Sequence, residues 1–182
     1  MHILLHICCA NCAIYPLSRL RTQEHQVTGY FYNHNIHPFT EYRRRLETVR
    51  DYATAENLPM IYHEPYLLDT FLANVAADPQ SRCRYCYQSR LEQTAREAKQ
   101  QNADGFSTTL LYSRYQDHQA ILACGQRLAD EYGLIFHYED YRSGWNQGIR
   151  ISKELGLYRQ QYCGCIYSER DRYASGQNAK IL

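Results

Sequence analysis

The sequence has 182 residues, of which 45% are apolar and 21% are charged, with 9 Gly and 5 Pro. This composition is typical of one domain with a hydrophobic core and excludes a disordered or low-complexity chain. The formal net charge is +1, whereas dedicated nucleic-acid modules are strongly basic. Apolar runs fall far short of the roughly 20 residues that cross a membrane, and no basic segment precedes an apolar stretch near Met1. We therefore expect a cytoplasmic protein that does not enter a membrane.

Apolar runs and their spacing predict the elements in chain order. Short runs rich in branched and aromatic residues predict strands over 2–7, 27–32, 60–63, 105–111 and 134–138. Apolar positions three and four apart predict helices over 13–22, 40–56, 67–76, 87–101 and 116–132. The remainder is predicted as helix and loop. This alternation predicts right-handed βαβ units. We expect a single α/β domain over 1–182: a three-layer, Rossmann-like parallel sheet of about five strands flanked by helices, with a helical C-terminal segment.

Seven of the eight cysteines fall in three groups, Cys8-Cys9-x-x-Cys12, Cys83-x-x-Cys86 and Cys163-x-Cys165. The first group follows the first predicted strand, at the edge where parallel sheets bind ligands, and no glycine-rich phosphate loop stands there. Clustered thiols in a reducing compartment are typical of metal ligands or redox groups. Seven exceed the four of one tetrahedral zinc, so they predict two metal sites, or one cluster with further thiols nearby.

Two details refine this prediction. Structural zinc sites use paired C-x-x-C knuckles, so the adjacent Cys8-Cys9 pair favours a different centre. Successive residues of a strand point to opposite faces, so both sulfurs reach one centre only where the chain turns. Cys124 stands alone, at helical spacing from Ile121 and Leu128, and is predicted to pack in the core.

Two loops at the same predicted sheet edge carry polar side chains. Asn33 and Asn35 in the loop 31–38 are candidate substrate-binding amides, although such a loop is equally typical of an Asx turn that caps a helix. His34 and His37 are less favoured as metal ligands because the cysteines suffice. The run 106–116 leads from a strand into a hydroxyl-bearing and amide-bearing loop. Arg43-Arg44-Arg45 are expected on a solvated helix face.

The motifs together resemble the QueH-type epoxyqueuosine reductases. The resemblance covers roughly residues 3–173 and rests on these stretches: His6-Ile7-Cys8-Cys9-Ala10-Asn11-Cys12, Phe31-Tyr32-Asn33, Asn35-Ile36-His37-Pro38, Glu41-Tyr42, Arg45-Leu46-Glu47, Arg82-Cys83-Arg84-Tyr85-Cys86-Tyr87, Arg90-Leu91, Phe106-Ser107-Thr108-Thr109-Leu110, Tyr141-Arg142, Lys153-Glu154-Leu155-Gly156-Leu157-Tyr158, Gln160-Gln161-Tyr162-Cys163-Gly164-Cys165 and Ser168-Glu169-Arg170. Asn11 and His34 depart from it, because the family commonly has Pro at both positions. The absence of these two prolines affects the rigidity of the loops and removes no metal ligand.

The resemblance implies a Rossmann-like fold of the HUP or PP-loop kind and the last step of queuosine synthesis. That step removes the epoxide oxygen of epoxyqueuosine in the tRNA anticodon loop, with two electrons and protons. The resemblance also implies a four-iron four-sulfur cluster beside a second iron, for which zinc could substitute, and no cobalamin. Carried over, the cluster ligands are Cys8, Cys9, Cys83 and Cys86, and the ligands of the second iron are Cys12, Cys163 and Cys165.

Further roles follow from this chemistry. Tyr115 and His37 are candidate proton donors, and Arg142 and Arg170 are candidate phosphate contacts beside the last cysteines. These arginines lie in the stretch from Arg142 to Arg172, which has six basic and three acidic residues. We expect a monomer whose partners are the tRNA and an unidentified electron donor.

Three alternatives stay open on the sequence. A zinc-stabilised nucleotide-binding domain would leave the adjacent cysteines unexplained, and a thiol–disulfide enzyme using Cys83-x-x-Cys86 would leave five clustered cysteines without a role. A tRNA thiolation enzyme would need a nucleotide-binding loop after the first strand, where this sequence has cysteines.

Overall fold

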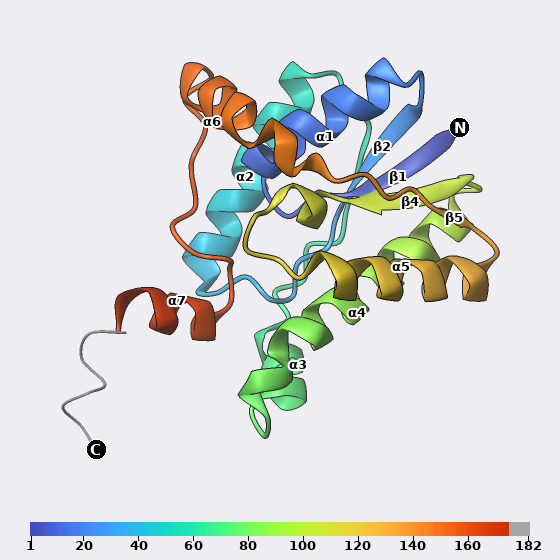
Figure 1. The fold of residues 1–182 in the computed structure, drawn as a ribbon. Helices are drawn as coiled ribbons and strands as arrows, with labels where there is room; N and C mark the ends of the chain where they lie inside the picture. Colours follow the sequence, from blue (N-terminus) through green and yellow to red (C-terminus); the bar gives the residue numbers. More distant parts are fainter. Residues whose placement is uncertain (175–182) are drawn as a thin grey trace.

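The sheet explains why the apolar runs are so short and so completely buried. The computed structural model describes residues 1–174, and in them the strands form one parallel sheet in the order β3-β2-β1-β4-β5 (Figure 1). The strands are β1 (His2–His6), β2 (Gln26–Phe31), β3 (Met60–Tyr62), β4 (Gly105–Thr108) and β5 (Ile135–Phe136). The predicted α/β fold with a parallel sheet of five strands is confirmed. The predicted domain runs to residue 182, and 175–182 lie outside the described residues.

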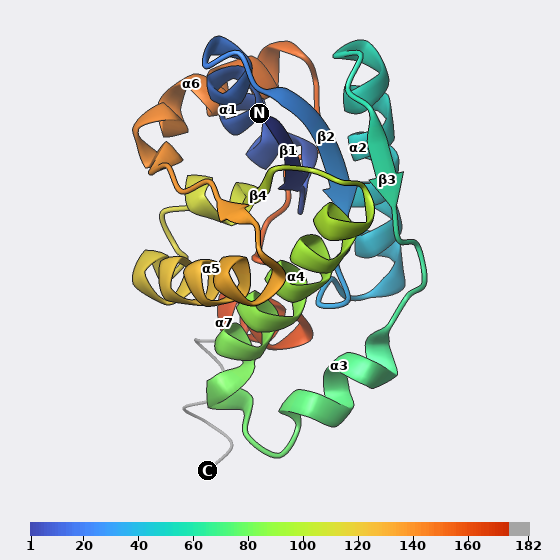
Figure 2. The same cartoon turned by 90° about the vertical axis from the view of Figure 1, so that its right-hand side faces the viewer.

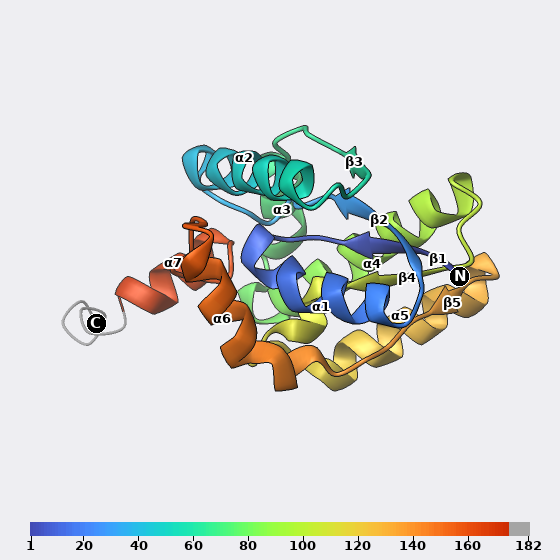
Figure 3. The same ribbon diagram turned by 90° about the horizontal axis from the view of Figure 1, so that it is seen from above.

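Helices cover both faces of this sheet, as predicted for a three-layer fold. They are α1 (Ala10–Thr22), α2 (Phe39–Ala55), α3 (Leu68–Val75), α4 (Arg82–Gln100), α5 (His118–Tyr132), α6 (Trp145–Glu154) and α7 (Ile166–Tyr173). Helices α1, α2 and α6 lie on one side and α4 and α5 lie side by side on the other (Figures 1 and 2). Seen from above, α6 lies against α1, and α7 follows at the margin of the molecule (Figure 3).

Alternation along β1 divides the core in two. Ile3 and Leu5 pack with α1 and α2, whereas Leu4 packs with α4 and α5. All three side chains are fully buried. Burial on both faces is the reason that the central strand reads as an unbroken apolar run. Cys124 is half-buried and packs against the second of these cores, as predicted.

Three predicted boundaries are wrong, and each error lies beside the cysteines. Helix α1 begins at Ala10 instead of residue 13, because the Cys9 sulfur caps it and accepts the amide of Cys12. Helix α4 begins at Arg82 instead of residue 87, so its first turns carry Cys83 and Cys86. The fourth strand stops at Thr108, whose hydroxyl accepts the Leu110 amide (3.1 Å) and starts a 3-10 helix over Thr109–Tyr112.

The strand order places a ligand-binding crevice beside β1. The chain runs from β1 outward to β2 and β3, and then returns to the other side of β1 for β4 and β5. In open α/β sheets, ligands bind at the carboxyl ends of the strands where the order reverses. Here that point lies between β1 and β4, where the Cys8 amide donates to Thr109 Oγ1 (3.2 Å). None of the helices among the described residues is long and apolar enough to span a membrane.

Candidate metal centre

The first cysteine group converges because the chain turns from β1 directly into α1. The sulfurs of Cys8, Cys9 and Cys12 all lie within 4.8 Å of one another. Cys9 and Cys12 are joined as a disulfide, so this pair must be reduced before its sulfurs can bind metal. A helix N-terminus carries a partial positive charge, which favours thiolates at this position.

The other two groups come from the opposite end of the sequence and from α4. Cys83 is exposed and Cys86 is buried on the first turns of α4, while exposed Cys163 and buried Cys165 lie just before α7. The Cys165 sulfur accepts the Ser168 amide (3.3 Å) as the cap of α7. Cys86 and Cys165 pack in one apolar cluster with Phe71.

Electrostatic coupling shows that the three groups share one neighbourhood. Burial raises the pKa of the Cys8 and Cys86 thiols, and the charge of Cys163 raises both further. Burial also raises the pKa of Cys83, with a further contribution from Cys163. Thiols buried in this way stay protonated unless a cation compensates for them, and a bound metal deprotonates its thiol ligands.

A buried arginine supplies positive charge at the same place. Arg90 is 2% exposed, and its Nε donates to the Cys86 carbonyl (3.1 Å). Its charge lowers the pKa of Cys8, Cys83 and Cys86, against the larger effect of burial. Among residues 1–174 it forms no ion pair with a carboxylate. A buried, unpaired cation is costly, so this arginine fits a site whose occupant is an anion, such as an iron–sulfur cluster with thiolate ligands.

A second buried arginine holds the last cysteine loop, and the expectation of a solvated face at Arg43-Arg44-Arg45 is wrong for this residue. Arg45 is 1% exposed, whereas its two neighbours are exposed. It donates to the carbonyls of Tyr162 (3.0 Å) and Cys163 (2.8 Å), and Glu41 fixes its Nε at 2.7 Å. The charged pair four residues apart on a helix was the available signal, but exposed pairs have the same spacing.

Amide and hydroxyl donors surround the sulfurs. Gln160 Nε2 donates to Cys9 Sγ (2.9 Å) and Cys12 Sγ (3.4 Å), and its own oxygen accepts from Asn11 (3.0 Å). Thr109 Oγ1 donates to Cys8 Sγ at 3.4 Å. Gln116 Nε2 lies 3.5 Å from Cys163 Sγ. Such donors orient thiolate ligands and set the potential of a metal centre. The sequence marks the stretches that carry Thr109, Gln116, Gln160, Arg45 and Arg90 but predicts no role for them at the sulfurs, because a donor to sulfur has no characteristic spacing.

The polar loop after β2 lies against this centre and is almost fully buried. Asn33 Nδ2 donates to the Ile7 carbonyl (2.9 Å), which holds the loop to the end of β1. His37 contacts the His34 carbonyl through Nε2 (3.1 Å) and the Ile166 amide through Nδ1 (3.4 Å), and burial lowers its pKa to about 4. The side-chain oxygens of Asn33 and Asn35 and both ring nitrogens of His34 have no hydrogen-bond partner among the described residues.

A cavity of about 790 Å³, here called the thiol groove, opens beside two of the cysteines. Its lining includes Cys12, Tyr112, Tyr115, Trp145, Arg159 and Cys163. Tyr115 is 84% exposed, so its hydroxyl is accessible from this groove, unlike the ring of His37. Arg142 and Arg170 are not part of the lining. They bind Asp140 (2.8 Å) and Asp171 (2.8 Å) respectively.

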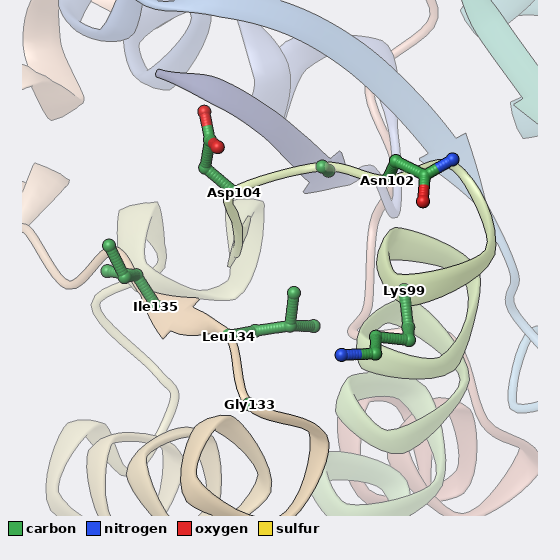
Figure 4. Close-up of a pocket in the computed structure, with 7 residues that line it drawn as sticks. Lys99, Asn102, Asp104, Gly133, Leu134 and Ile135 are labelled. Atoms are coloured by element: carbon green, nitrogen blue, oxygen red, sulfur yellow. The ribbon is translucent and has the colours of Figure 1, made fainter.

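Another cavity, of about 520 Å³, lies at the opposite, amino-terminal ends of β4 and β5. Figure 4 shows Lys99, Asn102, Asp104 and Ile135 around it. Its lining has no cysteine or histidine, so the metal-ligand chemistry gathers at the carboxyl edge.

Comparison with known proteins agrees with this geometry. Residues 3–171 match the family described as "Epoxyqueuosine reductase QueH". The epoxyqueuosine reductase QueH of Dehalococcoides mccartyi is 40% identical over 171 residues, covering 94% of each chain. That of Thermotoga maritima is 35% identical over 180 residues, covering 93% of this chain and 91% of its own. The match spans all three cysteine groups and nearly the whole fold, and the chain therefore belongs to the epoxyqueuosine reductase QueH family.

Proposed function

We propose that this protein reduces epoxyqueuosine to queuosine at the wobble position of tRNA, acting as a monomer in the cytoplasm. The observation that carries the proposal is that, in a chain of this family, the sulfurs of Cys8, Cys9 and Cys12 lie within 4.8 Å of one another, and Cys12 lines the thiol groove together with Cys163 from the distant third group. The reaction takes two electrons and two protons. The epoxide oxygen leaves as water and a carbon–carbon double bond forms between the two carbons that held it. An external reductant supplies the electrons.

The residues fit an iron–sulfur cluster with an adjacent iron. We assign Cys8, Cys9, Cys83 and Cys86 to the four-iron four-sulfur cluster, and Cys12, Cys163 and Cys165 to the second iron. The support is the thiol-rich donor set and the unpaired buried charge of Arg90, which balances a negative centre. When bound, these groups supply electrons one at a time and a Lewis acid for the epoxide oxygen.

The protein's own residues bind the substrate and deliver the proton. We assign proton donation to Tyr115, because its hydroxyl is accessible in the thiol groove. His37, the other candidate donor, has both ring nitrogens engaged, and we assign to it the support of the loop that carries Asn33 and Asn35. Asn33 and Asn35 remain predicted substrate-binding amides: their side-chain oxygens have no partner among the described residues, but both residues are buried and neither lines the thiol groove. Arg142 and Arg170 remain predicted contacts for tRNA phosphates.

Anaerobic purification followed by iron, sulfide and zinc analysis tests the metal assignment. We expect iron and acid-labile sulfide in the wild type, and reduction of epoxyqueuosine in an anticodon stem-loop when a chemical reductant is added. Cys163→Ser should lose iron and activity, whereas Cys124→Ser, which alters the cysteine outside the groups, should keep both. A colourless protein with stoichiometric zinc and no sulfide would support a zinc-stabilised domain and contradict the proposal.

A strain that lacks the gene tests the substrate. Its tRNA should accumulate epoxyqueuosine in place of queuosine, measured by mass spectrometry of the digested nucleosides, and the wild-type gene should restore queuosine. An unchanged nucleoside profile would overturn the proposed reaction, even for a protein that binds iron.

A further inference from the structure

Trp145 is the only tryptophan of the chain and lies at the cavity that contains two of the clustered cysteines. It is the first residue of α6, is half-buried, and lines the thiol groove together with Cys12 and Cys163. A large aromatic surface that stays partly in solvent beside reactive sulfurs is a candidate contact for a planar ligand.

The indole is held in place from the protein side. The ring of Tyr112, which is buried, stacks on it with centroids 5.2 Å apart and planes 25° apart. The Tyr112 hydroxyl also donates to the Trp145 carbonyl (3.0 Å). Gly148, one turn along α6, permits this packing, since a Cβ there would come within 2.2 Å of the Tyr112 oxygen. The indole is therefore preorganised before any ligand arrives.

On the solvent side, the indole is surrounded by an aromatic ring and by guanidinium groups, which are side chains suited to nucleic acid. Tyr115 meets the indole edge-on, with centroids 6.0 Å apart, and the Arg114 guanidinium lies 5.4 Å from its centroid. Arg159 and Arg172 also line the thiol groove. Within residues 1–174, none of these three arginines forms an ion pair with a carboxylate, in contrast to Arg170. Unpaired guanidinium groups beside an aromatic surface are the combination that binds bases and phosphates of single-stranded RNA.

We propose that Trp145 is the stacking platform for the flipped, fused-ring base of the substrate nucleotide, with Arg159 and Arg172 binding the flanking phosphates. The inference rests on the proposed function. A base reduced beside Cys12 and Cys163 must leave the anticodon stack, and it loses the stacking energy of its neighbours. An indole already fixed at the groove replaces that stacking with little further loss of entropy.

The single tryptophan makes the test direct, because the intrinsic tryptophan fluorescence of the protein comes from Trp145 alone. The holoenzyme is titrated anaerobically with an anticodon stem-loop RNA carrying epoxyqueuosine. The emission should be quenched in a saturable way, and a stem-loop with guanosine at that position should quench more weakly. For Trp145→Ala, KM for the stem-loop should rise roughly 10- to 100-fold, with a smaller change in kcat. Trp145→Phe should recover part of the loss.

Tyr138→Ala is the matched control, since it removes a partly exposed aromatic ring that lies outside the groove lining, and it should leave KM unchanged. If Trp145→Ala has the KM of the wild type, the stacking role of Trp145 is refuted, while the proposed reductase function is unaffected. Equal quenching by both stem-loops would also refute this stacking role, because the indole would then not distinguish the base. If the wild-type protein binds the stem-loop and its Trp145 emission is quenched, but the base is not reduced, the proposed reaction is refuted and the stacking role of Trp145 is not.

Discussion

Arg90 places a single buried positive charge beside the cysteines of the candidate metal centre. Its guanidinium is enclosed by the fold and acts on the thiols of α4 and of the first cysteine group. The pairing partner of a buried cation is usually a carboxylate in the same protein. In the proposed assignment, thiolate ligands take that place, which makes the charge of Arg90 part of the electrostatics of the proposed centre.

Replacing Arg90 by Gln should therefore make the proposed iron–sulfur cluster harder to reduce. Removing a unit positive charge that lies several ångströms from the cluster makes the free energy of its reduction less favourable by roughly 2–4 kcal/mol at an effective dielectric constant near 20. This change corresponds to a negative shift on the order of 100 mV in midpoint potential. Redox titration followed by EPR measures the shift. Arg90→Lys keeps the charge and should restore most of the potential. An Arg90→Gln protein with full iron content and an unchanged potential would contradict this role.

Gln160 acts on the sulfurs through hydrogen bonds instead of charge. In Gln160→Leu the donors to Cys9 and Cys12 are lost, and loss of such an outer contact typically weakens metal affinity about 10- to 100-fold. Competition with a colorimetric iron chelator measures the change. The neighbouring Gln161→Leu is the control, since its amide donates only to the Arg159 carbonyl (3.0 Å). If both variants release iron at the wild-type rate, the hydrogen bonds to sulfur do not hold the metal.

At the scale of elements, helix α2 positions a loop that lies far from it in sequence. Its buried Glu41–Arg45 pair reaches the carbonyls of the loop before α7 and so sets where Cys163 stands. A second pair on the same helix, Arg43–Glu47 (2.9 Å), has the same spacing but both of its side chains are more than half exposed. The two pairs thus compare burial at the same sequence spacing, although the order of acid and base along the helix is reversed.

We expect Arg45→Met to destabilise the fold by about 3–5 kcal/mol, because it leaves Glu41 buried without its partner. Arg43→Met should change the free energy of unfolding by less than about 0.5 kcal/mol. The double variant Glu41→Gln, Arg45→Met should recover part of the loss. Urea unfolding of the metal-free protein measures all three. Equal effects of Arg45→Met and Arg43→Met would show that burial does not distinguish the pairs.

For the molecule as a whole, the sheet edge gathers buried histidines as well as thiols. Burial lowers the pKa of His6 to about 3, of His34 to about 3 and of His37 to about 4, from an ordinary value near 6.5. Each histidine stays neutral in the folded protein and takes up a proton on unfolding below pH 6.5. The stability that depends on neutral histidines is therefore complete above that pH and is lost as the pH falls toward 4.

The free energy of unfolding of the metal-free protein should consequently fall by several kcal/mol between pH 7.5 and pH 5, at about 2 kcal/mol for each of the three histidines. Urea unfolding across this range measures the slope. His34→Phe removes one such group and should make the slope about one third shallower. A stability that is constant over the range would contradict the burial of neutral imidazoles.

The sequence predicts the sheet of this protein better than its site. Buried parallel strands appear as apolar runs, so all five strands were located, and the cysteine spacing marked the carboxyl edge. The start of α1 is predicted late because Cys9 occupies the N-cap position, where Ser, Thr or Asp normally signals a helix start. Helix α4 follows Ser81, but this side chain makes no capping hydrogen bond and ends a 3-10 helix over Pro79–Ser81, so the sequence signal for the start of α4 is weak. Arg45 and Arg90 carry no sequence mark that separates a buried guanidinium from a solvated one. Only the packing of distant elements makes that distinction.

The hydrogen bonds from Arg45 to the loop that carries Cys163 also have a consequence for biosynthesis. A ribosome translates Arg45 and the first five clustered cysteines long before it reaches the two carbonyls that this arginine binds. During that interval the nascent chain exposes an incomplete set of thiols and a cation without its acceptors. In the proposed assignment, the full set of metal ligands therefore exists only after the third cysteine group has been translated and Arg45 has bound the carbonyls of Tyr162 and Cys163.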